Sequence, residues 1–194
     1  MGADVVVIGS SWGGAEALRE VLGALPVDYP AAVAIAQHRS PGSRGVLTHF
    51  LQKHCLLPVR EADDKDVVVP GTVYLAPADY HLLVEGGTFA LTTDEMVQYS
   101  RPSVDVLFET AAHHFGARVI GVVLTGANED GAAGITAIRA RGGHTVAQSP
   151  DTCERPEMPA AAIATGAVDV VLPLDDIGPH LVALSHQRTR GVQR

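Results

Sequence analysis

Short apolar runs rich in Val and Ile recur along the chain, and segments with a helical spacing of charged side chains separate them. The runs show no alternation with polar residues, which is typical of strands covered on both faces, as in a parallel sheet. Runs of this kind occupy residues 5–8, 33–36, 73–76, 119–124, 145–147 and 170–172.

The segments between these runs carry helical patterns. In residues 15–22, Leu18 and Leu22 share one helical face, and the charged Glu16 and Glu20 share another. Gly, Pro or a capping Ser or Asp bounds the further helical segments, at residues 45–52, 103–113, 132–141, 159–164 and 177–186. Strand and helix therefore alternate, which predicts an α/β fold: a doubly wound, mostly parallel sheet with helices on both faces.

One stretch breaks this rhythm. Residues 81–85 and 88–92 read as two short strands around a Gly86-Gly87 turn, which predicts a small hairpin at a sheet edge. A length of 194 residues with 46% hydrophobic side chains suits one globular domain with its own core. We expect residues 1–186 to form that domain and the polar residues 187–194 to fray.

Charge and composition narrow the functional classes. The net charge is −8, and Lys53 and Lys65 are the only lysines, so we expect no nucleic-acid partner. No apolar run reaches the ~18 residues of a membrane span, and no basic segment precedes the first run. We therefore expect a cytoplasmic protein without membrane insertion. Cys55 and Cys153 lie in no metal-binding pattern, and we expect neither a metal nor a cofactor.

The first predicted strand leads into a turn rich in Gly and Ser, IGSSWGG at residues 8–14. Open α/β sheets gather their chemistry at such strand ends. Ala15 and Glu16 stand where a Walker A loop has Lys and Ser or Thr. The glycine spacing also differs from a Rossmann turn, and the second strand ends in Gln37-His38 rather than in an acid.

The turn does fit the pattern G-x-S-x-G at residues 9–13. In this pattern a sharp strand-to-helix turn exposes a serine hydroxyl, here Ser11, beside free backbone N–H groups. Such a serine can instead be a helix N-cap, and a five-residue pattern also arises by chance. A nucleophilic role requires a base and a group that orients the base.

Two other strand ends supply these groups. His38 closes the second strand, although a surface role is the commoner case for any single histidine, and His81 is a weaker reserve. Asp130 follows the buried run 119–124 and precedes a helix, where it also suits an N-cap. The chain order Ser, His, Asp differs from the Ser, Asp, His order of α/β hydrolases, so another serine-triad family is implied.

Further motifs follow in order along the chain: AQH at 36–38, PGTVYLAP at 70–77 with His81 after it, RPSVDVLF at 101–108, GVVLTG and EDGA within 121–132, and MP at 158–159. Together with IGSSWGG they resemble the catalytic domain of the chemotaxis protein-glutamate methylesterase family, CheB. The resemblance extends over about residues 5–184.

The resemblance implies that Ser11 is the nucleophile, His38 the general base and Asp130 its orienting partner. It also implies the reaction, which is hydrolysis of methyl esters on glutamate side chains in the helical cytoplasmic region of chemoreceptors. Deamidation of receptor glutamines is implied as a second activity. The oxyanion hole and the pocket are expected at Trp12, Gly13 and Ala127.

Three departures from the family pattern stand out. Trp12 replaces the usual Thr, which narrows the cleft or supplies a receptor contact. Asn128 and Glu129 replace the Gly and Asn of the family's GMGNDG loop, and we expect Glu129 to point away from the site. Typical members carry a receiver domain before the catalytic domain, whereas the first strand here begins at about residue 5. The chain is therefore either a stand-alone esterase, for which a receiver domain would act in trans, or a fragment of a longer protein. The alternative is a catalytically degenerate module that binds receptors or another signalling protein.

Overall fold

The computed structural model describes residues 5–40, 42 and 45–190, with residues 186–190 described by their backbone alone. A seven-stranded parallel sheet has the order β3-β4-β2-β1-β7-β8-β9, and the antiparallel hairpin β5-β6 lies outside it. This confirms the predicted α/β class. The strands are β1 (Val5–Ser10), β2 (Ala32–Gln37), β3 (Val59–Glu61), β4 (Val73–Leu75), β5 (His81–Glu85), β6 (Thr88–Thr92), β7 (Val119–Val123), β8 (His144–Gln148) and β9 (Val170–Leu172).

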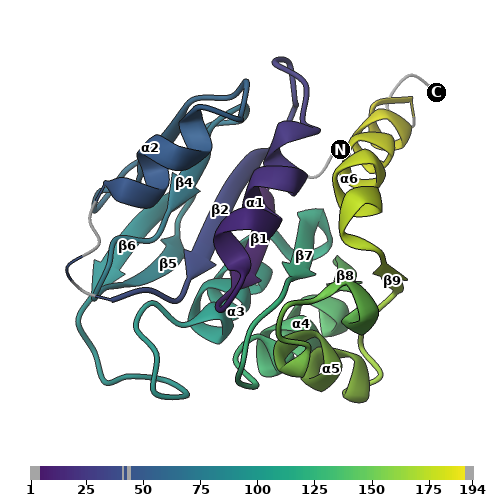
Figure 1. Ribbon diagram of the computed structural model, residues 1–194. Coiled ribbons are helices and arrows are strands. Elements are labelled where there is room, and N and C mark those ends of the chain that lie inside the picture. The colour runs from purple at the N-terminus through teal and green to yellow at the C-terminus, as the bar shows by residue number, and fades with distance from the viewer. Residues whose placement is uncertain (1–4, 41, 43–44, 191–194) are drawn as a thin grey trace.

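Helices cover both faces of the sheet (Figure 1). One core cluster joins the sheet to α1, α2 and α6, and the other joins it to α3, α4, α5 and the hairpin. No helix among the described residues has the length and apolar character needed to cross a membrane. The helices are α1 (Gly14–Gly23), α2 (Val46–Gln52), α3 (Val104–Phe115), α4 (Ala132–Ala140), α5 (Glu157–Ala164) and α6 (Leu174–Arg190), with 3-10 turns at Gly116–Arg118 and Pro150–Thr152.

The central strand β1 explains the unbroken apolar runs. All of its residues are buried, and successive side chains enter opposite layers because a strand has a side-chain period of two. Val5 and Val7 belong to the α3 side of the core, whereas Val6 and Ile8 belong to the α1 side. A strand covered on both faces favours apolar side chains, as the sequence pattern indicated, and the one polar side chain of β1, Ser10 at its carboxyl end, is buried with a hydrogen bond to Gln37.

One strand was not predicted. Among the three residues of the edge strand β3 only Val59 is buried, and no apolar run marks it. The last helix, α6, continues to Arg190, and the fraying expected of residues 187–190 stays a prediction. Residues 191–194 lie outside the described part of the chain.

The sheet brings three strand ends together. β1 pairs with β2 on one side and with β7 on the other, all in parallel. The pairing continues just past the strands, since the His38 amide donates to the Ser10 carbonyl and the Ser11 amide to the Thr125 carbonyl, both at 3.0 Å. The helices α1 and α4 leave β1 and β7 on opposite faces, so a topological switch point lies between these strands.

Gly9 allows α3 to approach this point. A Cβ atom at Gly9 would lie 2.2 Å from Cγ1 of Val104, the first residue of α3. Only a residue without a side chain therefore fits in β1 opposite the start of α3. This close packing sets the position of the α3 N-terminus, which borders the strand ends described below.

We predict that Gly9→Ala destabilises the protein by about 1–3 kcal/mol, the usual cost of overpacking a core. Val104→Ala removes the clashing methyl groups, so the double variant should lose less stability than the sum of the two single variants. Urea unfolding of the four proteins measures this coupling. Strict additivity would show that the contact between Gly9 and Val104 does not constrain the fold.

Candidate active site

Ser11 follows β1 directly and lies partly exposed at the switch point. Its carbonyl accepts hydrogen bonds from the Gly14 amide at 3.0 Å and from Nε2 of Gln37 at 2.8 Å, which hold the sharp turn into α1. No hydrogen bond within the described part of the chain uses the Ser11 hydroxyl. The hydroxyl is therefore not committed to the structural N-cap role that the sequence left open.

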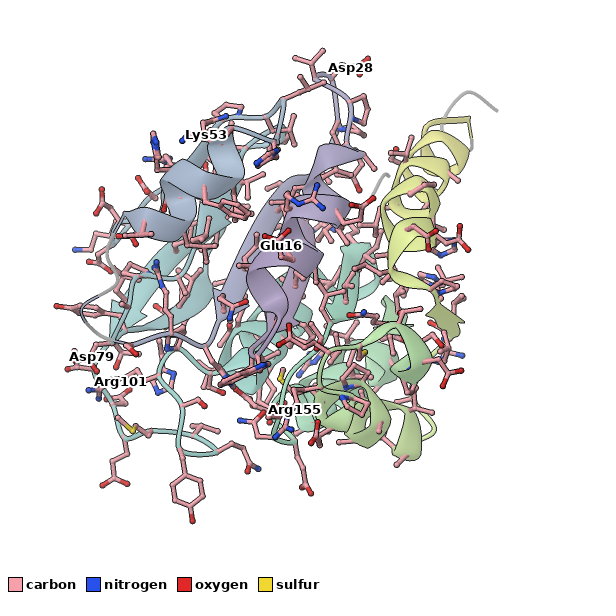
Figure 2. All side chains as sticks on the ribbon, viewed as in Figure 1. Glu16, Asp28, Lys53, Asp79, Arg101 and Arg155 are labelled. Atoms are coloured by element: carbon pink, nitrogen blue, oxygen red, sulfur yellow. The ribbon has the colours of Figure 1, made fainter. Side chains whose placement is uncertain are left out.

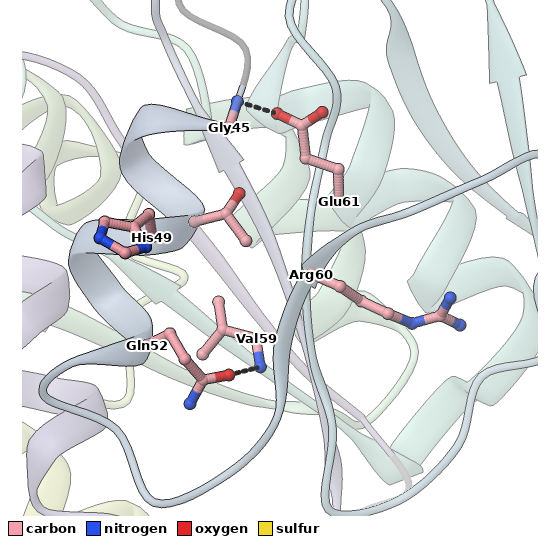
Figure 3. A pocket seen from close by; sticks show the side chains of 7 residues that line it. Gly45, His49, Gln52, Val59, Arg60 and Glu61 are labelled. Atoms are coloured by element: carbon pink, nitrogen blue, oxygen red, sulfur yellow. Dashed lines mark hydrogen bonds between the residues drawn. The ribbon is translucent and has the colours of Figure 1, made fainter.

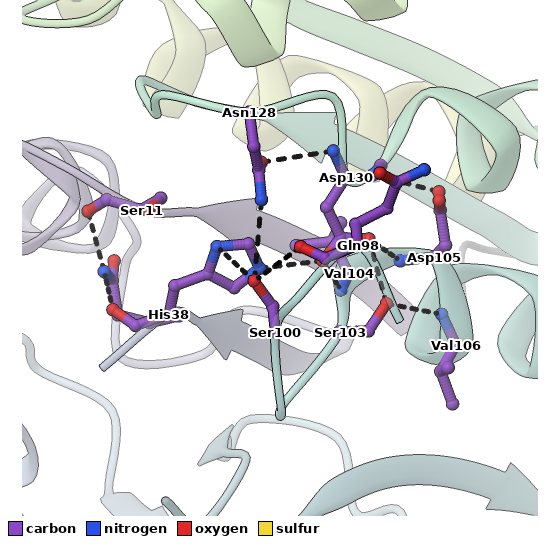
Figure 4. Close-up of polar contacts among 12 residues, drawn as sticks. Ser11, His38, Gln98, Ser100, Ser103, Val104, Asp105, Val106, Asn128 and Asp130 are labelled. Atoms are coloured by element: carbon purple, nitrogen blue, oxygen red, sulfur yellow. Dashed lines mark hydrogen bonds and ion pairs between the residues drawn. The ribbon is translucent and has the colours of Figure 1, made fainter. Parts of the chain in front are cut away.

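His38 and Asp130 are in direct contact, as Figure 4 shows. Nε2 of His38 lies 2.7 Å from Oδ2 of Asp130, and the imidazole is 12% exposed while the carboxylate is fully buried. The two residues are 92 positions apart in the sequence and meet because β2 and β7 both flank β1. The structure thus joins the predicted base to the predicted orienting acid.

The Asp130 carboxylate is also tied to the start of α3. Oδ2 accepts the Val104 amide at 2.7 Å, and Oδ1 accepts the Asp105 amide and the Ser103 hydroxyl, both at 2.9 Å. A carboxylate at a helix N-terminus also interacts favourably with the helix dipole. These contacts fix the position of the Asp130 carboxylate relative to the His38 ring.

The pKa of Asp130 lies below its usual value. Burial alone would raise it, but the hydrogen bonds from His38 and from the Asp105 and Val104 amides outweigh burial. The carboxylate is therefore ionised at neutral pH, and it accepts a hydrogen bond from the N–H at Nε2 of His38. In the neutral imidazole this arrangement places the proton on Nε2 and leaves the lone pair on Nδ1.

The expected oxyanion region is a turn built for close approach. Gly13 has φ 76°, and a Cβ there would lie 2.7 Å from Oε2 of Glu154. Trp12 is 63% exposed, and Nε1 of its ring donates to Oε1 of Glu154 at 2.6 Å. Within the described residues, no hydrogen bond uses the amide N–H of Trp12, Gly13 or Ala127. Backbone donors of this kind are available to an anion.

The loop after β7 runs against Ser11. A Cβ at Gly126 would lie 2.8 Å from the Ser11 Cβ, so this position also requires glycine. Ala127 and Glu129 are exposed, whereas the side chain of Asn128 turns back and accepts the Asp130 amide at 3.2 Å. Glu129 is exposed, and its orientation away from the site stays a prediction.

His81, the weaker candidate for the general base, has a structural role instead. The Ser103 amide donates to its Nδ1 at 3.1 Å, and its Nε2 lies 3.0 Å from the Glu95 carbonyl. Both nitrogens of this buried ring are occupied, so His81 braces the segment before α3. Arg101, in the same segment, lies beside Asp79 (Figure 2) and donates to its carboxylate. The Arg101 guanidinium also donates to the Thr93 and Asp94 carbonyls.

Two polar neighbours of the site were not predicted. Gln37 accepts the Ser10 hydroxyl and donates to the Ser11 carbonyl, and its position directly before His38 was the available signal. The Ser100 hydroxyl lies 3.3 Å from Nδ1 of His38. No sequence pattern marked Ser100, because Gln98 and Tyr99 adopt a left-handed turn without the usual Gly or Asn.

A separate cavity of about 460 Å³ lies between α2 and β3 (Figure 3). Its lining includes His49, Arg60 and Glu61, and it shares no residue with the group at the strand ends. No cluster of three or more potential metal ligands occurs among the residues that the structure describes.

The fold and the residues at the strand ends together define the class: an open α/β protein with a serine, a histidine and a buried aspartate at its topological switch point. The chain belongs to the CheB methylesterase family, whose model matches residues 6–181. A solved structure, the Thermotoga maritima CheB methylesterase catalytic domain, superimposes with a TM-score of 0.91 at 36% identity. It covers 95% of this chain and 100% of that domain.

Curated relatives carry matching names. A Leptospira interrogans protein, named provisionally as a protein-glutamate methylesterase/protein-glutamine glutaminase, is 42% identical over 95% of this chain and 96% of its own length. A Burkholderia pseudomallei protein-glutamate methylesterase/protein-glutamine glutaminase is also 42% identical, over 98% of this chain. This chain spans about half of that relative, 53% of its length.

Asp105 generates a prediction about pH. Its Oδ1 accepts the Gly131 and Gly134 amides at 2.9 and 2.7 Å, which holds the start of α4 next to Asp130. Burial, together with the charge of Asp130, raises its pKa to about 6 despite these bonds. Ionisation of Asp105 is thus harder in the folded protein than in the unfolded chain, whose value is near 3.8.

We expect Asp105→Asn to gain stability relative to the parent as pH rises. Below pH ~4 the parent carboxyl is protonated in both states and carries no penalty. Between pH ~4 and the folded pKa of about 6 the penalty develops, and above it the difference stays constant. Urea unfolding of both proteins from pH 4 to 7.5 measures the difference. A difference independent of pH would contradict the assignment.

Proposed function

We propose that this protein is a serine hydrolase that removes methyl esters from glutamate side chains of chemoreceptors, with Ser11, His38 and Asp130 as its catalytic triad. The observation that carries the proposal is the 2.7 Å contact between His38 and Asp130 at the strand end next to Ser11. The membership of the CheB methylesterase family supports the same reaction.

The geometry suggests a role for each group. The ionised Asp130 holds the proton of neutral His38 on Nε2, so Nδ1 is the nitrogen able to accept a proton from Ser11. Ser11 then attacks the ester carbonyl, and the unused amide N–H groups of Trp12 and Ala127 bind the developing oxyanion. Protonated His38 returns its proton to the methoxy oxygen, methanol leaves, and water hydrolyses the acyl-enzyme through the same base.

Deamidation of receptor glutamines follows the same steps, with ammonia as the leaving group. The names of the relatives, which include protein-glutamine glutaminase, support this second activity. We infer that the substrate lies in the helical cytoplasmic region of a methyl-accepting receptor. A protein substrate suits a site at which Ser11 and the Trp12 ring lie at the surface rather than in a closed cavity.

Ser11→Ala should reduce methanol release from a methylated receptor cytoplasmic fragment by about a thousandfold or more, because it removes the nucleophile. Asp130→Asn should cause a loss of similar order, since the imidazole then loses its ionised partner and its fixed tautomer. Labelling with a fluorophosphonate probe, followed by peptide mapping, reports the same nucleophile without a receptor.

Glu129→Gln is the matched control, because it makes the same acid-to-amide change one position away on an exposed side chain. Its methanol release should stay within about twofold of the parent. If the parent releases no methanol and takes no label at Ser11, the chain is a degenerate binding module, and the hydrolase proposal is wrong.

A further inference from the structure

The turn at residues 97–100 reaches the proposed base. The Val97 amide donates to the Ser100 carbonyl at 3.2 Å, and the Ser100 amide donates to the Val97 carbonyl at 2.9 Å. Between them, Gln98 and Tyr99 have positive φ angles of 50° and 60°. The turn therefore closes as a tight two-residue hairpin. Its last residue, Ser100, presents the hydroxyl that lies 3.3 Å from Nδ1 of His38 (Figure 4).

Nδ1 of His38 is the nitrogen that accepts the Ser11 proton in the proposed reaction. Asp130 occupies Nε2, so the neutral imidazole has one in-plane lone pair left, on Nδ1. The Ser100 hydroxyl lies against this lone pair. No hydrogen bond among the described residues links Nδ1 of His38 to Ser11. Ser11 and Ser100 must therefore use the same acceptor in turn.

We propose that Ser100 is a positioning residue that holds the His38 lone pair in the resting enzyme and competes with Ser11 for it. This inference rests on the proposed function, and it adds a determinant of how fast Ser11 is activated. The contact also holds the ring in place: Asp130 binds one nitrogen and Ser100 the other.

The surroundings of Ser100 allow the contact to break at low cost. Its single hydroxyl proton has a second acceptor within reach, the Gln98 carbonyl at 3.4 Å, so release of His38 leaves the hydroxyl hydrogen-bonded. Nδ2 of Asn128 lies 3.5 Å from the Ser100 oxygen and keeps the serine near the site in either state.

The turn is also free on its outer side. Tyr99 at the tip is 97% exposed, whereas the base of the segment is fixed by the contacts of Arg101 with Asp79 and with the Thr93 and Asp94 carbonyls. The turn at residues 97–100 can therefore shift at its tip without disturbing the core.

The test compares Ser100→Ala, Ser100→Thr and the parent by the second-order rate of fluorophosphonate labelling at Ser11. We expect Ser100→Ala to label about two- to tenfold faster, which corresponds to one ordinary hydrogen bond. Ser100→Thr keeps the hydroxyl and should label at the parental rate. A rate for Ser100→Ala equal to or below that of the parent overturns the inference.

A second readout separates this role from simple support of the loop. In nitrogen NMR of the imidazole, Ser100→Ala should shift the Nδ1 resonance of His38 while the proton stays on Nε2, because only the Nδ1 contact is lost. An unchanged Nδ1 resonance contradicts the proposal.

The site of labelling distinguishes the possible failures. Labelling of Ser11 at equal rates in all three proteins disproves only the role of Ser100. Absence of label from all three disproves the hydrolase proposal, and with it the inference. Labelling of Ser100 in the parent shows that the two serines have been assigned the wrong way round, and this also overturns the inference.

Discussion

The buried carboxylate of Asp130 is the constraint on which the site depends. A charge with no exposure to water is tolerated only when hydrogen bonds surround it, and Asp130 has four donors: His38 Nε2, the Ser103 hydroxyl and the Val104 and Asp105 amides. Because three of these belong to the start of α3, the position of that helix is set by the same charge that orients the imidazole. The scaffold and the candidate chemistry therefore share one set of contacts.

The parallel register explains why this charge reaches the proposed base. Ser11, His38 and Asp130 are far apart in the sequence, but each follows one of three adjacent strands whose ends align at one edge. The glycines at 9, 13 and 126 then let α3, the Glu154 side chain and the loop after β7 approach more closely than any larger residue permits. Strand order places the groups in the same region, and small residues bring them within contact distance.

Much of this was predictable from the sequence for physical reasons. Unbroken apolar runs indicate strands buried on both faces, and strand ends in such a sheet converge, so His38 and Asp130 could be paired before any coordinates were known. What failed lacked a local signal. β3 is held by its neighbour β4 rather than by its own three residues, and the Ser100 contact depends on a left-handed turn at Gln98 and Tyr99 for which neither residue type has a preference.

The departures from the family pattern lie where the geometry can absorb them. The oxyanion donor proposed at Ala127 is a backbone N–H, which a change of side chain leaves in place. Asn128 turns inward and accepts the Asp130 amide, so its side chain supports the loop in which a family glycine has none to offer. Glu129 is exposed, so its charge is solvated rather than buried. Trp12, next to Ser11, is larger than the Thr of the family pattern, and its indole N–H donates to Glu154. The substitutions thus change side chains around the proposed reacting groups, whereas Ser11, His38 and Asp130 themselves match the family pattern.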